Sequence, residues 1–281
     1  MRNGLGFTTR KARHASLARS VFPRSGAAAA PAGPATSKVV WVYAVTADLD
    51  ADQVSGLTGV AGEPVRVVSE AGIGAVVGSV NDAVFGEESL TSLLTDLTSV
   101  EEVGRAHHKV IASTASAGPV VPLRLATTYP DDATIRMLLA ARRAELTEML
   151  QDFTGRQEWG VKLYVEPPAG APRDGSAAMS ASGQDRLPRQ EWRWVTAEAW
   201  AEKIGQALSA IAVATRRHPA PDPLPGAQGG WMALNGVYLL SAERAAEFAE
   251  IVLALTAEHD ALRADLTGPW PPYSFADRTQ D

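Results

Sequence analysis

Residues 268–275 have the sequence GPWPPYSF, the stretch in which this chain restricts its own backbone most. Three of these residues are prolines, which hold φ at about −65°, and each residue before a proline is pushed toward extended geometry. Trp270, Tyr273 and Phe275 add large apolar surfaces. The stretch is therefore predicted to be an extended rod. Such a rod either docks on its own protein or is presented to another one.

The composition of the chain is that of a globular protein with a sizeable core. Its 281 residues are 46% apolar and 21% charged, and this length suits one large or two ordinary domains. The absence of cysteine excludes disulfides, zinc fingers and thiol nucleophiles. Because the sequence contains no run of about 18 apolar residues, no helix is expected to span a membrane.

Basic charge is concentrated at the start of the chain. Residues 1–37 carry six arginine or lysine side chains and no acid, whereas the rest carries 20 basic and 32 acidic side chains, a net charge of −12. An acidic body argues against nucleic-acid binding by the folded part, because that affinity comes largely from basic groups. We predict that residues 1–37 are a disordered basic extension. A transit peptide, or a segment that binds nucleic acid or membrane, is the alternative.

Apolar patterning predicts an N-terminal domain of mixed α and β structure over residues 38–156. Residues 38–45 read as a strand, and two apolar runs at 64–69 and 73–80 indicate a β-hairpin. A helical period begins at Leu90 and places His107 on the inward face. A further strand is expected at 119–129, followed by one helix of about five turns that ends near Gly155.

Residues 157–281 are predicted to form a ferredoxin-like C-terminal domain, so the fold class is α+β with two domains. Strands are expected at 158–165 and 231–240. One helix is expected to run from Trp200 to a point before Pro219, and Ser241 is expected to cap a second one whose apolar stripe ends at Leu262. Residues 167–188 have no apolar period and are predicted to be a mobile loop.

The extended tail, residues 268–281, follows directly from this last helix. Two strands alone give the domain too little sheet, and this shortage favours docking of the tail on its own domain. Residues 273–275 are then expected to form a short edge strand, a position where prolines are tolerated.

The polar residues within apolar segments have structural explanations. His107 is expected to be buried and hydrogen-bonded, because adjacent helical residues such as His107 and His108 do not face one metal ion. An inward Arg124 needs a carboxylate or carbonyl partner and is expected to act as a clamp. The sequence contains no nucleophile elbow, phosphate loop or H-E-x-x-H motif. We predict no catalytic, cofactor-binding or metal-binding residue; the alternative is a small-ligand or enzymatic module in an interdomain cleft around Arg124, His107 and Glu158.

Four stretches together resemble the gas vesicle protein L/F family: RAHH at 105–108, VPLRLATTY at 121–129, EWGVKLY at 158–164 and GPWPPYSF at 268–275. The residues that carry the family motifs are His107, Pro122, Leu123, Arg124, Glu158, Trp159, Gly160, Lys162, Gly268, Pro269, Trp270, Pro271, Pro272, Tyr273 and Phe275. Leu125 and Ala126 stand where the family has an aromatic residue and a glycine.

The resemblance implies a non-enzymatic accessory protein that takes part in the assembly of gas vesicles. It implies contacts with the main shell protein and with other accessory proteins. It also implies a location in the gas vesicle, including its gas-facing side, and in the cytoplasm. Because shell proteins of this kind are very apolar, exposed apolar surface on helices or strand edges is the expected means of contact.

Overall fold

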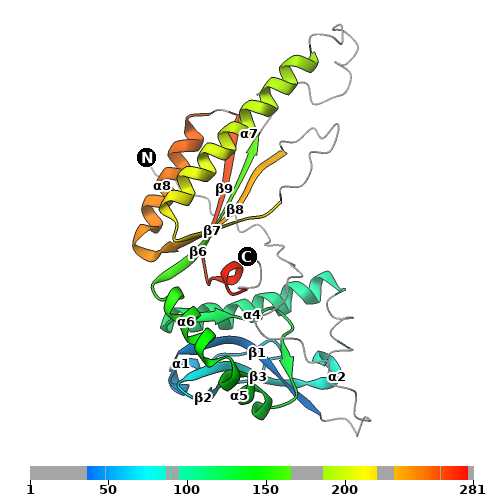
Figure 1. Cartoon of the computed structure of the whole chain (residues 1–281). Coiled ribbons are helices and arrows are strands. Elements are labelled where there is room, and N and C mark those ends of the chain that lie inside the picture. Colours follow the sequence, from blue (N-terminus) through cyan, green and yellow to red (C-terminus); the bar gives the residue numbers. More distant parts are fainter. Residues whose placement is uncertain are drawn as a thin grey trace, which may run out of the picture.

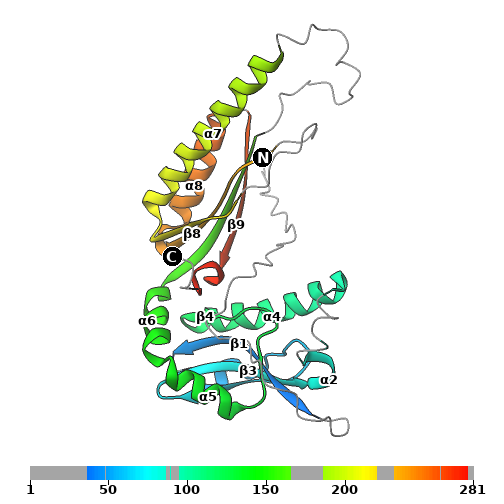
Figure 2. The same cartoon turned by 45° about the vertical axis from the view of Figure 1, so that its right-hand side comes forward.

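The structure is a computed structural model of the chain. It describes residues 37–47, 49–86, 89, 95–165, 186–219, 231–259 and 261–277, with the backbone alone for 186–198. Each half of the molecule contains one antiparallel sheet, and the last described turn lies between the halves (Figures 1 and 2). The predicted basic extension, most of the predicted mobile loop and the last four residues of the tail lie outside the described residues.

The first sheet is built around its central strand β1 (Lys38–Ala47). Its other strands are β2 (Val65–Glu70), β3 (Ile73–Asn81), β4 (Val120–Pro122) and β5 (Thr128–Tyr129). β3 pairs with one edge of β1, β4 and β5 pair with the other, and β2 pairs with β3, all antiparallel. The predicted hairpin is confirmed: β2 and β3 are joined by Ala71 and Gly72, which both have positive φ.

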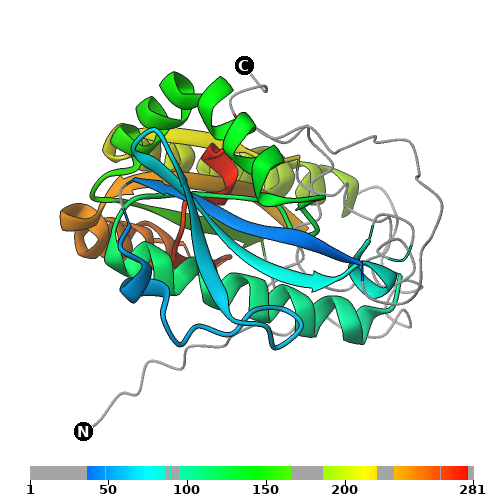
Figure 3. The same cartoon turned by 90° about the horizontal axis from the view of Figure 1, so that it is seen from below.

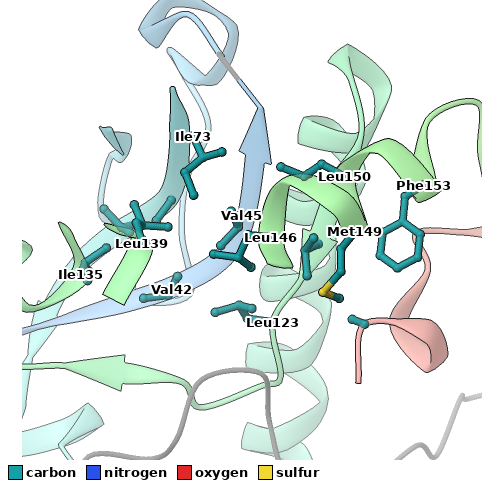
Figure 4. Packing of buried hydrophobic residues seen from close by; sticks show 14 of the residues in the cluster. Val42, Val45, Ile73, Leu123, Ile135, Leu139, Leu146, Met149, Leu150 and Phe153 are labelled. Atoms are coloured by element: carbon teal, nitrogen blue, oxygen red, sulfur yellow. The ribbon is translucent and has the colours of Figure 1, made fainter. Parts of the chain in front are cut away.

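Helices cover both faces of this sheet (Figure 3). They are α1 (Ala51–Val54), α2 (Asp82–Phe85), α4 (Leu97–Ala117), α5 (Asp132–Ala141) and α6 (Arg143–Phe153). Trp41 and Tyr43 of β1 pack with α1, α2 and α4, whereas Val42 and Val45 pack with α5 and α6 on the opposite face (Figure 4). The middle of β1, residues 40–46, is therefore buried from both faces, and a β-bulge between Val42 and Ala44 interrupts the regular alternation of its side chains.

Three predictions for this half are corrected by the structure. The described helix α4 begins at Leu97, where Asp96 accepts a hydrogen bond from the Ser99 amide at 3.0 Å; Leu90 lies outside the described residues. The strand expected at 119–129 is interrupted between β4 and β5 by a turn in which Ala126 has a φ of 70°. The long helix is divided at Arg142, because α5 packs across β2 and β3 while α6 turns toward β1, β4 and the second sheet.

The second half runs in the order strand, helix, strand, strand, helix, strand. The elements are β6 (Arg156–Val165), α7 (Arg186–Ile211), β7 (Ala214–Arg217), β8 (Trp231–Ser241), the 3-10 turn η2 (Ala242–Arg244), α8 (Ala245–Ala257), β9 (Leu262–Trp270) and the 3-10 turn η3 (Tyr273–Phe275). The strand order is β7-β8-β6-β9, all antiparallel. α7 and α8 cover one face of the sheet over a core that includes Leu163, Leu208, Tyr238 and Phe248.

Two strands of this sheet were missing from the prediction. β7 has the sequence ATRR and β9 begins LRAD, so charged residues interrupt the apolar pattern from which strands are predicted. The two segments are identified as strands by their pairing with β8 and β6. Leu262 therefore belongs to β9 and not to the last helix. Residues 186–188, predicted as the end of the loop, are the first residues of α7.

The prediction for residues 273–275 was also wrong. They form the 3-10 turn η3 and not an edge strand, and the Phe275 and Ala276 amides donate to the Pro272 carbonyl. Pro271 and Pro272 have no N–H group, so they cannot continue the ladder that β9 makes with β6. Self-docking of the tail is confirmed as far as Asp277, because both prolines and Phe275 are buried.

Within the part of the chain that the structure describes, no helix is both long and apolar enough to cross a membrane.

Candidate functional site at the junction of the two sheets

The motif residues that are far apart in sequence meet where the two sheets approach each other. We call this place the motif junction and define it by the side chains of α4, the β4–β5 turn, β6, β7 and the tail that contact one another there: His108, Arg124, Glu158, Arg216, Trp270, Tyr273, Ser274, Phe275 and Asp277.

His107 is a buried hydrogen-bonded residue of α4, as predicted from its place on the helix. Its Nδ1 accepts a hydrogen bond from Trp41 Nε1 at 3.0 Å, and its Nε2 lies 3.1 Å from the Leu123 carbonyl oxygen. Because the indole can only donate and the carbonyl can only accept, these contacts fit a neutral ring that is protonated at Nε2. Burial lowers the pKa of His107 to about 4.

His108 faces the tail. Its Nδ1 is 2.8 Å from the Tyr273 hydroxyl, and its ring centroid is 5.2 Å from that of Trp270. Burial lowers the pKa of His108 and raises that of Tyr273. The two adjacent histidines thus serve different partners, one inside the first sheet's core and one on the tail.

Arg124 has the carboxylate partner that its position required. It forms an ion pair with Asp277, whose backbone carbonyl also accepts a hydrogen bond from Arg216 Nη2 at 2.7 Å. Asp277 is only 8% exposed, and the Arg216 guanidinium lies over the Phe275 ring. The end of the tail is therefore held between one arginine from each half of the chain.

Glu158 at the start of β6 holds the middle of the tail. Its carboxylate accepts a hydrogen bond from the Ser274 amide at 2.6 Å and another from the Ser274 hydroxyl at 2.9 Å. Burial raises the pKa of Glu158 to about 7, although both hydrogen bonds and the nearby Arg216 favour the charged form.

The comparison with known families decides the identity of these motifs. Residues 39–277 match the family model described as gas vesicle synthesis protein GvpL/GvpF. This chain belongs to the GvpL/GvpF family. The recognition made from the four motif stretches is confirmed.

Relatives and solved structures of the family cover most of the chain. Gas vesicle protein L of a Streptomyces species is 35% identical over 251 residues, which are 86% of this chain and 94% of that protein. Gas vesicle protein F of the same strain is 27% identical over 76% of this chain and 89% of its own. The crystal structure of GvpF from an Anabaena species has a TM-score of 0.59 at 20% identity, covering 86% of this chain and 97% of that one. The mixed α and β architecture with two antiparallel sheets is thus shared with GvpF.

Some GvpL/GvpF motif residues shape the backbone beside the junction. Gly268 has a φ of 133°, and a Cβ atom there would lie 2.9 Å from the Glu158 carbonyl oxygen and 3.0 Å from the Trp159 ring. The Gly268–Pro269 peptide bond is cis. Pro122 ends β4, while Gly160 and Lys162 lie further along β6, opposite Thr267 and Asp265 of β9. Lys162 is therefore away from the motif junction.

Two residues of the junction were missed from the sequence. Asp277 and Arg216 lie 153 and 92 positions from Arg124, in segments that were predicted as the extended tail and as the end of a helix. The signal that could have found Asp277 was the need of Arg124 for a carboxylate. The sequence offered many acids for this role.

Two hollows of the described surface lie away from the motif junction. One hollow of about 460 Å³ lies along α5 and α6 beside Arg143 and Glu148, and one of about 230 Å³ lies between α6 and the β2–β3 turn. Neither is lined by Arg124, His107 or Glu158. Among the described residues, no group of three or more histidine or acidic side chains is placed to hold a metal ion. The contacts of the junction join the tail to both halves of the same chain.

Proposed function

We propose that this chain is a non-enzymatic accessory protein of gas vesicle assembly that binds the main shell protein and other gas vesicle accessory proteins. The observation that carries the proposal is the family match over residues 39–277. The motif junction supports it, because the polar and titratable residues of the family motifs form their hydrogen bonds with other residues of the same chain. The alternative, a ligand-binding or enzymatic module around Arg124 and His107, has no observation in its favour.

We further propose that the chain divides into an N-terminal domain at 38–156 and a ferredoxin-like domain at 157–281. The element order of the second half and its strand order β7-β8-β6-β9 support this assignment, since the ferredoxin-like β-α-β-β-α-β arrangement places its first and last strands, here β6 and β9, side by side. The motif residues then act as fasteners between the domains.

Contact with an apolar shell protein requires exposed apolar surface, and the described surface offers it at separate places. Five large apolar side chains are between 44% and 75% exposed: Val84, Leu97, Met137, Val213 and Leu253. They lie on α2, α4, α5, the turn before β7 and α8. We propose that such residues contact the shell protein. We also propose that the chain is located in the gas vesicle, including its gas-facing side, and in the cytoplasm.

A deletion and capture experiment tests the function. The gene is removed cleanly from a vesicle-forming host, and vesicles are counted by electron microscopy with and without the native gene supplied in trans. In the same host, a tagged copy is used to capture the shell protein. We expect loss of vesicles, restoration by the native copy, and co-capture of the shell protein.

Substitutions sharpen this test. Leu97→Asp and Leu253→Asp change exposed contact candidates, and Glu102→Gln is a matched exposed control. Reduced capture by either leucine variant with an unchanged circular dichroism spectrum supports a binding role. Normal vesicles after clean deletion would disprove the proposed function.

A further inference from the structure

The outward side of α8 has a composition that is unusual for a helix in contact with water. We call Glu250, Leu253, Ala254, Ala257 and Glu258 the α8 outer face; all five are exposed, and Leu253 is 60% exposed. Their spacing of three and four positions places them on one side of the helix, opposite the buried Phe248 and Val252. Three of these five residues, Leu253, Ala254 and Ala257, are apolar, whereas the water-facing side of an amphipathic helix is normally charged or polar. In Figure 1, α8 lies on the outside of the second sheet.

The same face is acidic. Glu250 and Glu258 flank the apolar residues, and Glu243 lies just before the helix. Arg244, which lies just before the helix, is engaged with both carboxylate oxygens of Glu247 at 2.9 and 2.8 Å. The exposed side of α4 differs, because there Arg105 pairs with Glu101 and Lys109 follows. A fitting occupant of the α8 outer face is thus basic and apolar at once.

Residues 1–36 have that composition. They carry six basic side chains and no acid, together with Leu5, Phe7, Leu17, Val21 and Phe22. The match to the family model begins only at residue 39, so this segment is an addition to the part shared with GvpL/GvpF proteins. Its charge is opposite to the net charge of −12 carried by the rest of the chain.

We propose that residues 1–36 dock on the α8 outer face of their own chain. At about 3.3 Å per extended residue, 36 residues can span more than about 100 Å, which is ample for a protein of this size. A tether also raises the effective concentration to the millimolar range, so weak charge pairing and burial of Leu253 suffice. Any partner of α8 then competes with the basic segment. The docking does not rest on the proposed function, although it would cover Leu253, one of the contact candidates named there.

Energy transfer between two dyes on the full chain tests the docking. The native chain has no cysteine, so Ser16→Cys and Ala242→Cys label the segment and the exposed turn η2 just before α8 without competition. We expect strong transfer at about 50 mM salt and at least about a two-fold loss of transfer at about 500 mM salt, where exposed charges are screened. The double substitution Glu250→Lys with Glu258→Lys is expected to cause a similar loss at low salt.

The matched control is Asp52→Lys with Glu102→Lys, which makes the same change of charge at exposed positions on α1 and α4. It should leave the transfer unchanged. Equal loss in both double variants would overturn the choice of α8, and transfer that is insensitive to salt and to both changes would overturn the docking. Mixing singly labelled chains adds a third check, since transfer between separate chains would overturn docking within one chain.

Discussion

His107 and Glu158 are two buried titratable residues whose effects on stability oppose each other. The pKa of His107 is about 4 in the folded chain, below its usual 6.5, so the unfolded chain binds the extra proton between these values. Stability from this residue is present above pH 6.5 and is lost as the pH falls toward 4. The pKa of Glu158 is about 7, above its usual 4.5, so the folded chain holds the extra proton. Stability from Glu158 is present below pH 4.5 and is lost as the pH rises through 7.

The substitution Glu158→Gln should reveal this balance. Glutamine keeps a polar partner for Ser274 but cannot ionise. The free energy of unfolding of the variant should therefore rise relative to that of the native chain as the pH rises from about 4.5 to about 8. The gain should approach about 3 kcal/mol, since each pKa unit corresponds to about 1.4 kcal/mol. Urea unfolding across this pH range measures it, with Glu102→Gln on exposed α4 as the control. A difference between variant and native chain that is constant with pH would contradict the prediction.

Ala126 has a backbone conformation that suits glycine. Its φ is 70°, a region that costs a side chain with Cβ about 1–2 kcal/mol. Ala126→Gly should therefore stabilise the folded chain by up to about 1 kcal/mol, because removing Cβ relieves this strain. Chemical denaturation measures the change. The control Ala140→Gly, exposed on helix α5, should instead lose about 0.5–1 kcal/mol.

Among the elements of the fold, the tail connects the two halves through its side-chain contacts. Phe275 and Ala276 belong to the same apolar cluster as Met149 of α6 and Leu239 of β8, so residues from both halves close around η3. Four polar contacts reinforce this packing, through His108, Arg124, Glu158 and Arg216. The tail, predicted as an extended rod, is thereby held by contacts with both halves of the described chain.

Removing residues 271–281 should lower stability markedly. The truncation uncovers apolar surface in both halves and leaves Arg124 without its carboxylate, so we expect a loss of at least about 3 kcal/mol and reduced solubility. The control chain ends after Asp277 and keeps every described contact of the tail. Calorimetry of the two truncated chains distinguishes them. Unchanged stability together with lost partner binding would favour a tail that serves a partner.

At the scale of the whole molecule, the shared cluster should make the two halves unfold together. In the native chain, the slowest-exchanging amides of β1 and β6 should report the same opening free energy in hydrogen exchange. Phe275→Ala should lower the opening free energies of both strands and make them unequal. Phe275 is only 8% exposed between the halves, and its loss costs about 3 kcal/mol. Leu253→Ala, on the exposed side of α8, is the control. Unequal values in the native chain would show that the halves are independent.

Elements with local patterns were predictable from the sequence: the β2–β3 hairpin, the strands β1, β6 and β8, the buried side of α4, and the family. Apolar periodicity and turn residues act over a few positions, so they are visible without a structure. Tertiary contacts were needed to establish that β7 and β9 are strands, that the long helix breaks at Arg142, and that Asp277 is the partner of Arg124. These features depend on hydrogen bonds and charges between residues that are distant in the chain. GPWPPYSF restricts its own backbone by local sterics, but the place where its turn docks is set by Glu158, His108 and the cluster that both halves share.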